Sequence, residues 1–119
     1  MDRLTQERIA ENDSRFRDAN ERIYEVATDY AVDVAIPFLC ECADARCTEV
    51  VRLQPDQYGR VRTNPRWFLK VAGHERVEGA AARVVSSHDG WVVAEKMGHA
   101  GRVAEELAGE QDGLPEGER

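Results

Sequence analysis

Three cysteines stand close together near the middle of the chain, at Cys40, Cys42 and Cys47, with the spacing C-x-C-x4-C. Thiolates are strong zinc ligands, and a closed structural zinc site takes four ligands at the corners of a tetrahedron. On an extended strand Cys40 and Cys42 point to the same side, and the loop that follows can fold back and bring Cys47 against them. This spacing predicts that three thiolates converge on one metal ion, with reduced free thiols as the alternative.

The fourth ligand has to come from elsewhere in the chain, and His74 is the strongest candidate. It directly follows Gly73, which lets the backbone turn sharply, and both come just after an apolar segment at residues 67–71. We therefore expect His74 to complete a zinc site with the three cysteines. The alternatives for the fourth position are His88 in an expected turn, His99 at an expected helix start, Asp44 and a water molecule.

The residues around the candidate ligands do not form a known zinc-enzyme motif. A metalloprotease would show H-E-x-x-H and a zinc deaminase H-x-E with P-C-x-x-C, and neither pattern occurs. Glu41 and Glu75 adjoin candidate ligands, yet neither spacing is diagnostic of a general base. The sequence also lacks a phosphate-binding loop, a G-x-G-x-x-G motif and a nucleophile elbow. We expect no catalytic residue and a structural zinc ion, with a zinc enzyme or a thiol redox sensor as weaker alternatives.

A long helix is expected at the N-terminus, over residues 1–31. The first thirty residues contain no Gly or Pro, and Ile9, Phe16, Ile23 and Tyr30 recur at intervals of seven. This periodicity is typical of one amphipathic helix. Its apolar stripe can pack on the protein's own sheet, or it can pair with a second copy or another protein.

The rest of the chain predicts short strands and helices. Strands are expected at residues 32–39, 49–53 and 67–71, and a hairpin is expected at residues 82–86 and 91–95 around Asp89-Gly90. Pro55 can open a short helix to about residue 63, and a last helix at residues 99–108 is expected to end at Gly109. The order predicts an α+β fold with a small, mostly antiparallel sheet, a C-terminal hairpin and a short C-terminal helix.

The chain is long enough for one domain with a modest core, because it has 119 residues. We expect a zinc-containing α+β domain at residues 32–108, after the N-terminal helix. Residues 109–119 are rich in Gly, Glu and Pro, which predicts a disordered acidic tail. The N-terminus has no apolar run of the kind found in a signal peptide or a membrane span, so we expect a cytoplasmic protein without membrane contact.

A locally basic stretch interrupts a chain whose net charge is −7. Its arginines and lysine can neutralise phosphates, and Trp67 and Phe68 among them can stack on bases, which makes a nucleic-acid-binding or transcription-associated protein an alternative. The overall acidic charge instead favours a protein partner. The basic residues expected to make the nucleic-acid surface are Arg52, Arg60, Arg62, Arg66 and Lys70.

Two resemblances accompany the cysteine pattern. The C-x-C-x4-C spacing is similar to the post-SET zinc knuckle of histone methyltransferases, although nothing else here resembles a SET domain. Over residues 8–108 the chain resembles a family of short, uncharacterised bacterial proteins, chiefly from actinobacteria, in which the histidine usually follows Pro-Gly; this chain has Ala72 in place of that proline. The matching positions are Phe38-Leu39-Cys40-Glu41-Cys42-Ala43-Asp44, Cys47, Tyr58, Val61-Arg62, Pro65, Phe68-Leu69, Gly73-His74-Glu75, Val92-Val93 and Glu95-Lys96.

The family resemblance implies a shared zinc site and domain, but it supplies no known activity. Together with the residue patterns it predicts a small cytosolic zinc-binding protein that acts as a protein-interaction or regulatory module. The partner is expected to be another protein or a second copy, bound through the N-terminal helix.

Overall fold

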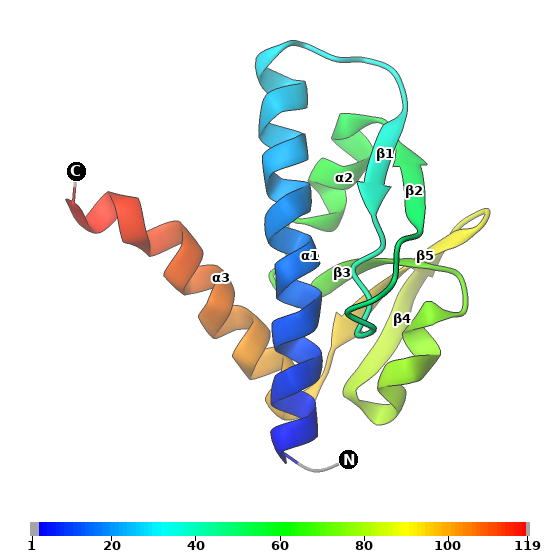
Figure 1. The fold of residues 1–119 in the computed structure, drawn as a ribbon, viewed down its shortest axis with the longest axis vertical. Coiled ribbons are helices and arrows are strands. Elements are labelled where there is room, and N and C mark those ends of the chain that lie inside the picture. Colours follow the sequence, from blue (N-terminus) through cyan, green and yellow to red (C-terminus); the bar gives the residue numbers. More distant parts are fainter. Residues whose placement is uncertain (1–2, 119) are drawn as a thin grey trace.

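The computed structural model describes residues 3–118, apart from the side chains of residues 3, 6, 77 and 110–118. Two helices, α1 and α3, stand at the two ends of the chain, and Figure 1 shows them meeting near their N-terminal ends and diverging from there. The elements in order are α1 (Arg3–Asp29), β1 (Ile36–Leu39), β2 (Val50–Leu53), α2 (Pro55–Val61), β3 (Trp67–Val71), the 3-10 helix η1 (His74–Ala81), β4 (Ala82–Ser87), β5 (Trp91–Lys96) and α3 (Gly98–Glu118). The predicted α+β fold is confirmed.

The strands form two antiparallel sheets in place of the single sheet that we expected. β1 pairs with β2, and β5 lies between β3 and β4 in a three-stranded sheet. The predicted strand at residues 67–71 and both strands of the predicted hairpin are present, with Gly90 at a φ of 84° in the connecting turn. Because strand pairing across long loops is not encoded locally, the sequence could predict the strands but not their division into two sheets.

The three-stranded sheet is packed on both of its faces along β3 and β5. On one face Leu69 and Val93 join an apolar cluster with residues of β1, β2 and α2, including the fully buried Phe38 and Tyr58. On the other face the buried Phe68, next to Leu69 in β3, lies beneath the guanidinium of Arg17 from α1, at 4.4 Å from the ring centroid. Thus α1 packs on its own domain, which was one of the expected alternatives for this helix.

The buried side of α1 differs from the predicted apolar stripe. Ile9 is buried, but Tyr30 lies beyond the end of the helix and is 79% exposed. The most buried large side chains of the helix include Asp13, Arg17 and Asn20, which are polar. Ile9 and Ile23 of the predicted stripe pack against apolar clusters. The polar residues between them contact the sheet and the cysteine segment through hydrogen bonds and ion pairs, which the apolar repeat does not predict.

The C-terminal helix α3 runs past Gly109, where we expected it to end, and reaches Glu118. A glycine inside a helix costs about 1 kcal/mol relative to alanine, so it weakens a helix without stopping it. The disordered acidic tail expected at residues 109–119 stays a prediction, because the side chains of residues 110–118 and the whole of residue 119 lie outside the described residues. In the described part of the chain, no helix is both long enough and apolar enough to cross a membrane.

Candidate metal centre

The four predicted ligands lie together. The ligand atoms of Cys40, Cys42, Cys47 and His74 are all within 4.8 Å of one another. Nδ1 of His74 is 3.5 Å from Sγ of Cys40 and 3.6 Å from Sγ of Cys47. A tetrahedral zinc ion with bonds of about 2.3 Å to sulfur and about 2.05 Å to nitrogen separates sulfur from nitrogen by about 3.6 Å. The four side chains therefore have the donor types and the spacing that a tetrahedral metal ion requires.

Two local turns bring the more distant ligands to the site. Residues 44–47 form a tight turn in which the N–H of Cys47 donates to the carbonyl of Asp44 at 3.0 Å, and the Asp44 side chain accepts from the N–H of Arg46 at 2.9 Å. Gly73, with a φ of 97°, starts η1 and places His74 at its first position. The sharp turn expected from this glycine is confirmed, since a positive φ disfavours any residue with a Cβ.

The imidazole of His74 is held from its far side as well. While Nδ1 faces the thiols, Nε2 lies 3.1 Å from a carboxylate oxygen of Glu49. A carboxylate on the second ring nitrogen is a common partner of a metal-bound histidine, because it fixes the tautomer and the orientation of the ring. Sequence reasoning missed Glu49, whose only signal was its position two residues after Cys47.

The thiols perturb one another strongly. The hydrogen bond from Cys40 is the main cause that lowers the pKa of the Cys42 thiol to about 5, and the same bond raises the pKa of Cys40. Burial raises the pKa of Cys47, and the hydrogen bond with Cys42 raises that of His74. Without a cation, ionisation of one of the three thiols is favoured, but ionisation of all three is not, because the negative charges would repel one another at this distance. A bound divalent cation would remove that conflict and allow all three to ionise.

The cysteine segment also covers the open edge of β3. The N–H of Glu41 donates to the carbonyl of Leu69 at 2.6 Å, and the N–H of Leu69 donates to the Glu41 carboxylate at 2.8 Å. Two residues further along β3, the N–H of Val71 donates to Sγ of Cys40 at 3.1 Å. Since an uncovered strand edge is a site for aggregation, the segment protects β3 while β3 orients the first cysteine.

Glu41, between the first two cysteines, is the centre of a buried hydrogen-bond network. Its fully buried carboxylate accepts from Arg17 at 3.2 and 3.3 Å, from Asn20 at 2.9 Å and from the hydroxyl of Tyr58. Asn20 also bonds both backbone groups of Leu39, at 2.8 and 2.9 Å. Burial, with the charge of Glu41, raises the pKa of Tyr58, which keeps its hydroxyl protonated as a donor. The polar face of α1 thereby fixes the segment that carries Cys40 and Cys42.

A second buried ionic cluster lies behind the site and consists of Asp13, Lys70, Glu78 and Lys96, all with less than 1% of the residue exposed. Nζ of Lys70 is 2.9 Å from Asp13 and also contacts Glu78, while Lys96 contacts both carboxylates. Two bases and two acids make this cluster neutral. Because η1 carries both His74 and Glu78, the cluster and the candidate metal centre share one element.

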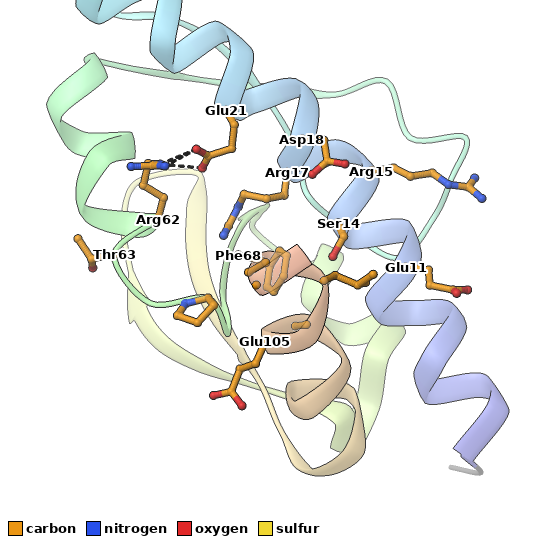
Figure 2. Close-up of a pocket in the computed structure, with 15 residues that line it drawn as sticks. Glu11, Ser14, Arg15, Arg17, Asp18, Glu21, Arg62, Thr63, Phe68 and Glu105 are labelled. Atoms are coloured by element: carbon orange, nitrogen blue, oxygen red, sulfur yellow. Dashed lines mark hydrogen bonds and ion pairs between the residues drawn. The ribbon is translucent and has the colours of Figure 1, made fainter. Parts of the chain in front are cut away.

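The basic surface predicted for nucleic acid is only partly present. Lys70 is fully buried, so its placement on that surface was wrong. Arg62 donates to the carboxylate of Glu21 at 2.7 and 2.8 Å, and Arg66 donates to that of Glu105 at 2.8 Å. Figure 2 shows the pair of Arg62 and Glu21, which lies at one end of a hollow of about 600 Å³ between α1 and α3. Arg52 donates to the carbonyl of Ala35 at 3.3 Å, and Arg60 is 3.9 Å from Asp56. Most of these charges are thus satisfied within the chain.

The alternative fourth ligands do not join the group. The ring of His88 stacks on Trp91, and its Nε2 lies 3.0 Å from the hydroxyl of Ser86. His99 pairs with Glu7 at 3.2 Å, and Asp44 serves in the turn before Cys47. Among the residues that the structure describes, the group that could hold a metal ion contains His74 as its one histidine.

Comparisons of the chain with protein-family models, with curated proteins and with solved structures found no match. The resemblance to the bacterial family therefore stays a prediction.

Proposed function

We propose that the centre holds a structural zinc ion and that the protein is a zinc-stabilised interaction module without catalytic activity. The observation that carries this proposal is the convergence of three thiols and one imidazole within 4.8 Å. Sulfur-rich sites favour soft or borderline metals, whereas magnesium and calcium take oxygen ligands. Tetrahedral coordination by sulfur and nitrogen is characteristic of structural zinc.

A structural role is favoured because the protein itself can supply all four ligands. Catalytic zinc usually has three protein ligands and keeps the fourth position open for water or substrate. Here the remaining nitrogen of His74 faces Glu49, and Glu41 is engaged by donors from α1, α2 and β3. Neither carboxylate is free to act as a general base beside the metal.

The zinc ion would link three parts of the chain: the segment after β1, the turn at Cys47 and the start of η1. Structural zinc contributes about 10–16 kcal/mol in small zinc-finger peptides, while whole domains are stable by about 5–15 kcal/mol. Because the two ranges are similar, loss of zinc is expected to unfold this small domain, or at least to release the edge of β3. We therefore expect the metal-free protein to aggregate.

An interaction role is supported by the molecular surface of α1 and the loop after it. Several large apolar side chains here are exposed, namely Leu4 (69%), Val26 (56%) and Tyr30 (79%). Aromatic residues such as tyrosine are enriched at protein interfaces. We infer that the partner is another protein or a second copy, and that the reduced thiols operate in the cytoplasm, where such sites are kept intact.

Replacement of His74 by alanine tests the assignment of the centre. We expect His74→Ala protein to lose most of its zinc after dialysis, because only three ligands remain. His88→Ala is the matched control, since His88 is exposed and contacts Trp91 and Ser86. Zinc content is measured by atomic emission. Equal zinc retention by the two variants would remove His74 from the centre.

A further inference from the structure

A second hollow, of about 320 Å³, lies between α2 and the β4–β5 hairpin. We call it the tryptophan cleft. The residues of its lining that matter here are Arg60, Trp67, Val85, His88, Trp91 and Val93. None of these side chains belongs to the candidate metal centre, and none takes part in the buried ionic cluster.

Two tryptophan rings line the cleft. Trp67 and Trp91 are the two tryptophans of the chain, and both are half-buried. They sit on adjacent strands, where Trp67 pairs with Glu95 and Trp91 pairs with Val71, so both point to the face that bears Val93. Both pack against the apolar core, and the ring of His88 stacks on Trp91 with 3.8 Å between the ring centroids. Tryptophan is one of the residue types enriched among those that dominate the binding energy of an interface.

A bulge in β4 adds a third wall. In the register with β5, Val84 pairs with Ala94 and Ser86 pairs with Val93, which leaves Val85 as an extra residue. In a regular strand, consecutive side chains point to opposite faces, but here Val85 and Ser86 both line the cleft. The bulge thus turns an additional apolar side chain toward the two tryptophans.

The charge around the cleft differs from that of the whole chain. The chain has 23 acidic and 16 basic residues, yet no carboxylate is among the residues that line this hollow in the described structure. The charged side chain at its rim is Arg60, which is 72% exposed and lies 3.9 Å from the equally exposed Asp56. An exposed pair at that distance is weak, so Arg60 can turn to another carboxylate.

We propose that the tryptophan cleft binds a peptide segment of a partner protein, with one large apolar side chain between Trp67 and Trp91 and flanking acidic residues facing Arg60. This inference rests on the proposed role as an interaction module and adds a second contact surface, on the side of the sheet opposite α1. The apolar lining fits the anchor side chain. Because Arg60 is the charged residue at the rim and no carboxylate lines the cleft, acidic residues next to the anchor side chain of the peptide are favoured over basic ones.

Because both tryptophans of the chain line the cleft, tryptophan fluorescence can report binding there. Acetylated pentapeptides with a central Phe, Leu or Ala, flanked on both sides by Glu, Ser or Lys, are titrated into zinc-loaded full-length protein. Tryptophan emission, excited at 295 nm, is recorded. We expect saturable changes for Phe or Leu between glutamates, and at least about tenfold weaker binding for a central Ala or for lysine flanks.

Arg60→Glu tests the charge preference without touching the core. We expect it to weaken binding of the Glu-flanked peptides at least about tenfold and to improve binding of the Lys-flanked ones. Arg102→Glu, an exposed substitution of the same kind on α3, is expected to change neither. Zinc content and melting temperature of every sample are measured in parallel, so that a failed zinc site is distinguished from a failed cleft.

Two results would overturn the proposal. One is the lack of saturable binding by any of the peptides in protein that retains zinc and melts normally. The other is saturable binding of oligothymidylate, weakened by Arg60→Glu, without binding of the peptides, which would assign the cleft to single-stranded nucleic acid instead.

Discussion

Replacing Glu41 by glutamine would leave the guanidinium of Arg17 buried beside a neutral side chain. Oε1 of Glu41 accepts from Arg17 and Leu69, and Oε2 accepts from Arg17, Asn20 and Tyr58. Whichever way the amide is placed, its NH₂ group faces at least two donors. Removal of one partner from a buried ion pair typically costs about 3–5 kcal/mol. Because glutamine keeps the size and one acceptor, we expect a loss near 3 kcal/mol.

Urea-induced unfolding in the presence of saturating zinc measures this loss. Asp56→Asn is the control, because the side chains of Asp56 and its partner Arg60 are 73% and 72% exposed, and such an exposed pair contributes at most about 1 kcal/mol. The double variant Glu41→Gln, Arg17→Gln completes a cycle. Since it removes the unpaired charge, we expect it to be less destabilised than the sum of the two single variants.

A Glu41→Gln protein whose free energy of unfolding lies within about 1 kcal/mol of the parent, the range of an exposed pair, would show that Arg17 does not depend on the charge of Glu41. Strict additivity of the cycle would also contradict this prediction, because it would mean that Glu41 and Arg17 do not depend on each other.

Three further predictions concern Glu49, the buried ionic cluster and the exposed end of α1. Glu49→Gln should weaken zinc affinity by about tenfold in a chelator competition, because the carboxylate orients His74, and unchanged affinity would contradict that role. Lys96→Met should lower the free energy of unfolding in urea by about 3 kcal/mol or more, since it leaves an excess negative charge in the buried cluster. Adding Glu78→Gln to this variant should restore part of the loss. An unchanged free energy of unfolding in Lys96→Met alone would contradict the role of the cluster. Tyr30→Ser should change the free energy of unfolding by less than about 0.5 kcal/mol, because Tyr30 is 79% exposed, and a larger loss would show that it packs.

The local patterns of the sequence predicted much of the fold. The strand at Trp67–Val71, the hairpin around Asp89-Gly90 and the helix opened by Pro55 all depend on neighbouring residues, and all are present. The cysteine spacing and the Gly73-His74 pair also identified the four side chains that the structure brings together. These features were accessible because short segments encode them.

The buried charges could not be predicted in the same way. Charged residues on a helix usually face solvent, so Asp13 and Arg17 gave no sign of burial, and Lys70 was placed on a surface. Their partners lie far away in sequence, as with Arg17 and Glu41 or Lys70 and Asp13. Only tertiary contacts show that the charges are matched. The apolar repeat was correct for Ile9 and Ile23 and wrong for Tyr30, and it gave no sign of the polar residues that α1 buries.

The most direct test of the central proposal is the zinc content of the purified protein, measured by native mass spectrometry, together with thermal melting before and after treatment with a chelator. We predict one zinc ion per chain, loss of the cooperative transition when the ion is removed, and its recovery when zinc is added back. A chain that purifies without metal and melts at the same temperature with and without the chelator would contradict a structural zinc site.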